Sequence, residues 1–246
     1  MKKIINQMIA SVLVNSVYAM KGYPTMVISN LLAPVSIIIV VAFASHGTLL
    51  GEAVAGGFMM LFISAGLSLQ ADLSHIKNDF KMQEMIVASP TRAATYLAGM
   101  AISELIFIIP SIIVLSVLAV MFIHTTFAAA LEVTAVLLVL FIFSLVFGFF
   151  LSTFSTDVIQ SWSFFGILSV LLTTIPPVYY PITYIPMPWR YLAYISPTTY
   201  AAGIVQNALG YLKLSVTMLA IDWIVTVVTL ALLLAVAIKK NRWREE

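Results

Sequence analysis

The sequence predicts an all-α integral membrane protein with six transmembrane helices, an N-terminal interfacial helix and an interrupted outer segment before the last helix. Three observations support this prediction. Hydrophobic residues make up 62% of the 246-residue chain and charged residues only 9%, whereas a soluble domain has about 25% charged residues. Apolar segments of near-spanning length recur along the chain, and basic residues gather at alternate connections between them.

Residues 1–23 have the pattern of an amphipathic helix. Apolar side chains recur at helical spacing from Ile4 to Met20, while Lys3, Gln7 and Asn15 fall on the opposite face. We expect this helix to lie in the plane of the membrane interface. The alternative is that residues 1–23 form a frayed polar segment that leads into the first span.

Six later segments are apolar enough and long enough to cross a bilayer core, which requires about 20 helical residues. They cover residues 25–45, 53–71, 94–123, 133–151, 161–178 and 218–238. An even number of spans places both ends of the chain on the same side of the membrane.

The basic residues identify that side. Two of the twelve, Arg190 and Lys213, follow the fifth span, where the chain faces the opposite side. The other ten precede the first span, separate the second from the third, or follow the last: Lys2, Lys3, Lys21, Lys77, Lys81, Arg92, Lys239, Lys240, Arg242 and Arg244. Since positive charge accumulates in cytoplasmic connections, we expect a multi-pass protein of the cell (plasma) membrane with both termini in the cytoplasm.

The connection from Asp72 to Arg92 carries most of the mid-chain charge. Apolar residues such as Ile76 and Phe80 recur between its charges, which predicts a helix along the membrane surface, ended by Ser89-Pro90. Such a helix would offer a docking face to a soluble partner. A solvated charged loop is the alternative.

The segment ahead of the last span, residues 179–217, begins in a stretch rich in proline and aromatic residues. Residues 175–202 contain six prolines, a density that interrupts any helix. The same stretch holds six tyrosines and Trp189, side chains that favour the membrane–water boundary. We therefore expect a broken, interfacial segment on the outer side.

Glu104 lies about 16 Å along the third span if that helix starts near residue 93. An ionised carboxylate there costs on the order of 3 kcal/mol, so we expect its side chain to face protein or water. Two interpretations stay open, a role in substrate passage or gating and a structural hydrogen bond to a neighbouring serine or tyrosine. Asp222, near the outer end of the last span, is expected to be a solvated end residue.

No set of residues in the sequence is typical of catalysis or metal binding. Cysteine is absent, and His46, His75 and His124 have no second ligand at helical spacing. The nucleotide-binding pattern G-x-x-x-x-G-K-[ST] does not occur in the sequence. A net charge of +2 is too small to indicate nucleic acid. We expect no catalytic residue, no metal site and no nucleic-acid partner.

Three motifs resemble those of the ABC type-2 exporter permeases. The first is Glu84-Met85-Ile86-Val87-Ala88-Ser89-Pro90 with Gly99 beyond it. The second, Gly148 with residues 152–160, looks like that family's loop between the fourth and fifth helices. The third is the most specific and is similar to the family's signature ahead of the last helix: Pro177-Val178-Tyr179-Tyr180-Pro181, then Ile185-Pro186, Trp189-Arg190 and Ser196-Pro197-Thr198-Thr199-Tyr200-Ala201.

The resemblance covers nearly the whole chain and implies one transmembrane domain over residues 1–246. It implies pairing with a second permease, as a homodimer or with a sister subunit, and with cytoplasmic ABC ATPase subunits. The chain itself would bind no cofactor, since ATP and Mg²⁺ belong to the ATPase. The implied ATPase-coupling residues are Phe80, Lys81, Glu84 and Pro90. The implied outer gate is a re-entrant segment with Pro177, Tyr179, Tyr180 and Pro181, and Glu104 is the candidate residue of the translocation path.

The implied function is that of the permease subunit of an ATP-driven exporter for an amphiphilic drug, lipid or glycan-type substrate, surrounded by membrane lipids. Motion of the ATPase would shift the docked surface helix and expose a central path to alternate sides. An ion-gradient-driven secondary transporter or channel is the alternative. It predicts paired intramembrane acids, or an internal repeat with two interrupted helices in matching halves, whereas the sequence indicates one deep acid and one interrupted region. A purely structural scaffold would leave the docking surface and the outer segment unexplained.

Overall fold

The computed structural model describes residues 2–78, 93–155 and 157–240, and every regular element in these residues is a helix, as predicted. The helices are α1 (Lys2–Val12), a π-helical segment (Leu13–Tyr18), α2 (Ala19–Gly22), α3 (Pro24–Ala44), α4 (Leu50–Asn78), α6 (Ala93–Phe107), α7 (Ile109–Phe122), α8 (Phe127–Ser152), α9 (Val158–Ser169) with a π-helical end (Val170–Thr174), a 3-10 turn (Ile182–Tyr184), α10 (Arg190–Ala193), α11 (Pro197–Ala208) and α12 (Val216–Lys240).

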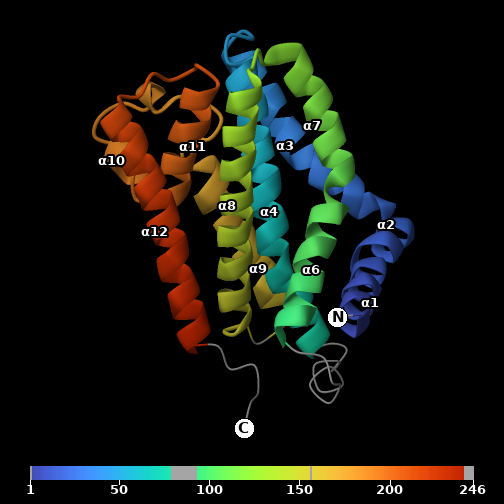
Figure 1. Ribbon diagram of the computed structural model, residues 1–246. Coiled ribbons are helices and arrows are strands. Elements are labelled where there is room, and N and C mark those ends of the chain that lie inside the picture. Colours follow the sequence, from blue (N-terminus) through green and yellow to red (C-terminus); the bar gives the residue numbers. More distant parts are fainter. Residues whose placement is uncertain (1, 79–92, 156, 241–246) are drawn as a thin grey trace.

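The centre of the bundle is formed by α4 and α8 (Figure 1). Other helices bury 78% of the apolar stretch of α4, but only 11% of that of α3 and 11% of that of α12. The mean hydropathy of α3 and of α12 is nevertheless higher than that of α4. Apolar surface of this kind needs an apolar environment outside the chain, which lipid or another membrane subunit supplies. Length and composition therefore support an integral membrane protein.

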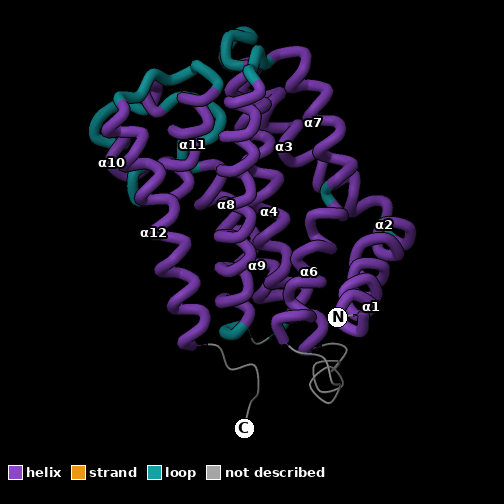
Figure 2. The backbone as a smooth tube through the Cα atoms, in the orientation of Figure 1, coloured by secondary structure: helices purple, strands orange, loops and turns teal. Residues whose placement is uncertain are grey.

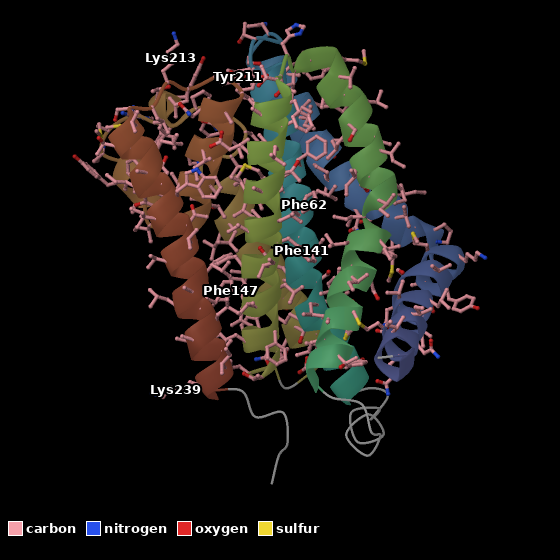
Figure 3. The ribbon with its side chains drawn as sticks, viewed as in Figure 1. Phe62, Phe141, Phe147, Tyr211, Lys213 and Lys239 are labelled. Atoms are coloured by element: carbon pink, nitrogen blue, oxygen red, sulfur yellow. The ribbon has the colours of Figure 1, made fainter. Side chains whose placement is uncertain are left out.

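Small residues allow α4 and α8 to approach closely. A Cβ atom added to Gly66 of α4 would lie 2.6 Å from Ser144 Cβ and 2.7 Å from the backbone nitrogen of Leu145. Glycine at such a contact brings two helix backbones together, the common way for helices to associate in membranes. Near this contact, the rings of Phe62 and Phe141 meet edge to face, with centroids 6.5 Å apart (Figure 3).

Local signals set several helix ends. Thr126 caps α8 by accepting a hydrogen bond from the Ala129 amide, and Asp157 caps α9 by accepting one from the Gln160 amide, at 3.3 and 2.7 Å. Proline stands at the first position of α3 and of α11, where its missing N–H is not needed. The tight turn between α3 and α4 uses Gly47 at a φ of 82°, a conformation that glycine adopts without strain.

The span predicted over residues 94–123 is not one straight helix. The structure has α6 and α7 instead, bent by 45° at Ile108. Pro110 explains the break, because it has no amide proton for the hydrogen bond to Ile106 and its ring collides with that carbonyl. The chain thus has an interrupted helix in addition to the outer segment.

Two other predicted boundaries also differ. The helix expected over residues 161–178 ends at Thr174, since Pro176 and Pro177 cannot continue it. The helix expected over 53–71 continues to Asn78, so Asp72 belongs to α4 and not to a surface segment. By length and composition the described residues hold four candidate spans, or five if α6 and α7 count as one; α9 with its π-helical end is a shorter apolar helix.

The N-terminal helices lie beside the bundle, against α6 (Figure 1). Ser103 of α6 donates a hydrogen bond to the Ser11 carbonyl at 3.4 Å, and Gly99 leaves room for the Ser11 side chain. The start of α1 and the end of α12 lie at the same end of the bundle (Figure 2). Lys239 is at this end and Lys213 at the opposite one (Figure 3).

Candidate functional site

The segment predicted as an outer gate is inserted between α4 and α11. Val178 and Tyr179 are only 1% and 2% exposed. A Cβ atom on Gly56 of α4 would lie 2.6 Å from the Val178 carbonyl oxygen and 2.8 Å from Tyr179 Cδ1. The Tyr179 hydroxyl donates a hydrogen bond to Met60 Sδ, also on α4, at 2.7 Å. The segment is therefore packed directly on the central helix.

Gln206 of α11 holds this segment in place. Its side-chain amide donates hydrogen bonds to the Pro177 carbonyl at 3.0 Å and to the Tyr180 carbonyl at 3.1 Å, and the residue is 3% exposed. Buried carbonyls in a non-helical segment need such partners. Gln206 was not among the residues predicted from the sequence. The signal for it was a polar amide side chain among the otherwise small and apolar buried residues of α11, because a buried amide needs hydrogen-bond partners.

An apolar groove of about 680 Å³ opens between the end of α3 and the outer segment. Its wall includes Tyr180, and the remaining residues are Val40, Val41, Ala44, Ser45, Thr48, Leu49, Ile175, Tyr184, Ile185, Pro186, Trp189, Leu192 and Ala193. Burial raises the pKa of the Tyr180 hydroxyl above its ordinary value. Of the four predicted gate residues, Tyr180 lines this groove, while Pro177, Tyr179 and Pro181 are buried.

Glu104 of α6 is 8% exposed and contacts two polar side chains of α4. Its Oε2 lies 2.6 Å from the Ser68 hydroxyl, and its carboxyl group hydrogen-bonds to that of Asp72. The carboxyl pair joins α4 to α6, with Glu104 buried and Asp72 half-buried.

These contacts match the structural interpretation of Glu104, a hydrogen bond to a neighbouring serine. Glu104 does not line the apolar groove beside Tyr180. Its role in a translocation path stays a prediction. The expectation of a single deep acid is wrong, since Asp72 shares the site; the two residues are far apart in sequence and only the packing of α4 on α6 brings them together.

The predicted coupling residues Phe80, Lys81, Glu84 and Pro90 lie outside the described residues. The nearest described element before them is α4, which ends at Asn78. Within the described ranges, no group of three or more histidine, aspartate or glutamate side chains could hold a metal ion.

Most of the chain is similar to one known protein family. The sequence model described as "ABC-2 type transporter" matches residues 4–209, from the N-terminal helices through α11. No curated protein matches the chain.

Proposed function

We infer that this chain, which belongs to the ABC-2 type transporter family and is therefore the permease subunit of an ABC transporter, forms the translocation path of an ATP-driven exporter. The family match over residues 4–209 is the observation that carries the proposal. Since the sequence lacks the G-x-x-x-x-G-K-[ST] pattern, ATP and Mg²⁺ are bound by a separate cytoplasmic ABC ATPase. The permease itself needs no cofactor.

The proposed topology has six spans in one domain. It counts α6 and α7 as one bent span and α9 with its π-helical end as a short one, followed by a re-entrant outer segment and α12. An even number fits the placement of the start of α1 and the end of α12 at one end of the bundle (Figure 2). The basic residues near that end favour the cytoplasmic side of a plasma membrane.

The central helix α4 offers a direct route from the ATPase to the outer gate. The proposed coupling residues follow Asn78 at one end of α4, whereas Gly56 near its other end touches Val178 and Tyr179. These two positions are about 33 Å apart along a helix. A displacement of α4 by the ATPase would therefore act on the outer segment without an intermediate element.

The substrate we propose is an amphiphilic drug, a lipid or a glycan-type molecule. The apolar groove beside Tyr180 supports a partly apolar substrate, because most of its lining is aliphatic or aromatic. The exposed apolar faces of α3 and α12 fit contact with membrane lipids and with a second permease, either another copy or a sister subunit.

Two observations favour the alternative, a transporter or channel driven by an ion gradient. The Asp72–Glu104 pair and the break between α6 and α7 are features that such proteins use. We rank this second, since the family match points to ATP-driven transport.

The test of the proposal is purification of the chain from its native membrane in mild detergent, followed by mass identification of co-purifying proteins. We expect a stoichiometric soluble protein that carries a P-loop. A monodisperse preparation without such a partner would overturn the ATP-driven proposal and favour the gradient-driven one, for which Glu104→Gln is the first variant to assay.

The same purification tests the coupling contact. Glu84→Lys places a positive charge where the proposed interface holds a negative one, and like charges at an interface cost several kcal/mol. We expect recovery of the ATPase to fall by about tenfold or more, with the permease still monodisperse. Glu132→Lys, a matched charge reversal at the opposite end of the bundle, should leave recovery unchanged. Equal recovery of the ATPase with both variants would show that Glu84 is not part of the interface.

A further inference from the structure

A small pocket of about 230 Å³ lies between α11, the outer end of α12 and the outer segment. Asp222 of α12 is on its wall, and the residue is partly buried, not the solvated end residue expected from the sequence. Its wall also includes Tyr194, Thr199, Tyr200, Gln206 and Met218. Asp222 supplies the pocket's acidic group, and no basic side chain lines it.

The Asp222 carboxylate approaches the backbone of α11. A Cβ atom on Gly203 would lie only 2.6 Å from its Oδ2 atom, so glycine is what allows the carboxylate to sit there. Among the described residues, none of the hydrogen bonds or ion pairs involves its side-chain oxygens. Arg190, a cation of the same outer region, instead donates to the carbonyls of Ile185 and Thr183.

The other polar groups of the pocket are directed elsewhere. The Thr199 hydroxyl donates to the Ala193 carbonyl, the Tyr200 hydroxyl donates to the Tyr194 carbonyl at 3.0 Å, and the Gln206 amide donates to the outer segment. No donor of the wall is thus left to neutralise the Asp222 carboxylate. An isolated carboxylate in a partly apolar site is costly unless a cation joins it.

The walls define which cation fits. The rings of Tyr194 and Tyr200 lie 5.8 Å apart at an angle of 47° and border the pocket. Most of the remaining lining is aliphatic, which cannot replace the oxygen ligands that a hard metal ion requires. Aromatic faces and aliphatic walls instead suit a cation that carries carbon substituents. The volume lies below the usual range of about 300–1,000 Å³ for drug-sized ligands, which limits the ligand to a small head group.

We propose that this pocket binds an alkylammonium group, with the Asp222 carboxylate as its counter-ion and the rings of Tyr194 and Tyr200 as its aromatic wall. The group is either a free amine or the amine head group of an outer-leaflet lipid. The site is independent of the Asp72–Glu104 pair and of the ATPase contact.

The test uses the full-length chain in nanodiscs made only of phosphatidylglycerol, which has no amine. Binding of radiolabelled tetramethylammonium is measured by equilibrium dialysis in a constant excess of sodium chloride. We expect saturable binding of one cation per chain. Asp222→Asn, which keeps the shape of the side chain, should weaken binding by about tenfold or more.

Two further variants separate binding from folding. Glu132→Gln removes one negative charge outside the pocket, keeps an oxygen that can accept the hydrogen bond from Trp223, and should bind tetramethylammonium like the wild type. Tyr200→Leu should weaken binding several-fold more than Tyr200→Phe, because only the first removes the aromatic face. Equal binding by the wild type and by monodisperse Asp222→Asn, or binding that does not saturate, would overturn the proposal.

A second set of nanodiscs identifies the source of the ammonium group. If a lipid head group is the natural ligand, discs of phosphatidylethanolamine or phosphatidylcholine should suppress tetramethylammonium binding relative to phosphatidylglycerol. If the ligand is a free amine, the three lipids should give the same binding. Either result retains the Asp222 site.

Discussion

Replacing Gly66 with alanine is expected to lower the melting temperature of the purified chain. The added methyl group would lie 2.6 Å from Ser144 Cβ and 2.7 Å from both the Leu145 nitrogen and the Phe141 carbonyl oxygen. Two of these atoms belong to the backbone of α8 and cannot rotate away. Overpacking of this kind costs about 1–3 kcal/mol, which corresponds to a loss of roughly 2–12 °C for a chain of this size.

The measurement is the fraction of monodisperse protein after heating, followed by size-exclusion chromatography. Gly166→Ala is the matched control, since Gly166 is exposed on α9 and a Cβ atom there meets nothing within 4 Å. Alanine favours a helix over glycine by about 1 kcal/mol, so the control should be as stable as the wild type or more so. Equal stability of the Gly66→Ala and Gly166→Ala variants would show that α4 and α8 are not in close contact at Gly66.

Replacing Gln206 with leucine is expected to release the outer segment. The substitution leaves the carbonyls of Pro177 and Tyr180 without their buried donor, at a cost of about 1–3 kcal/mol for each group. Local opening should become at least about tenfold more frequent, since 1.4 kcal/mol is a tenfold change in an equilibrium. If the segment is the outer gate, passive leak of substrate should rise as well.

Cysteine labelling measures this opening. The sequence has no cysteine, so Tyr180→Cys introduces a single reporter for a membrane-impermeant maleimide. Labelling should be at least about tenfold faster when Gln206→Leu is added. Asn207→Leu is the control on the same helix, because the Asn207 side chain accepts one hydrogen bond from Leu214, away from the gate residues. Unchanged labelling in the Gln206 variant would refute the assignment of Gln206 as the anchor of the segment.

The helical fold follows from local properties of the sequence. The apolar run at residues 25–45 corresponds to α3 and the run at 218–238 to α12, because hydropathy and proline effects act over a few neighbouring residues. The break at Ile108 could also have been predicted from the sequence. Proline interrupts a helix, which is why the outer segment was predicted to be broken, and Pro110 has the same effect on residues 94–123. The strong apolar character of these residues instead suggested a single span.

The candidate site was predictable only in part. A buried Glu104 with a hydrogen bond to a serine was among the expectations, since a charged group inside a span must find a partner. That partner's identity, and the presence of Asp72 beside it, depend on how α4 packs against α6. The anchoring of Pro177 and Tyr180 by Gln206 likewise joins residues that are distant in the sequence.

The sequence by itself determined that this protein is helical and apolar, that its segment after residue 175 is interrupted, and which family it belongs to. Only the tertiary structure decided that α4 is the central helix, that its glycines contact both α8 and the outer segment, and that Asp222 lines a pocket. The physical reason is the distance along the chain over which each effect acts. Hydropathy, capping and proline effects act between near neighbours in the chain, whereas these contacts depend on the joint packing of several helices.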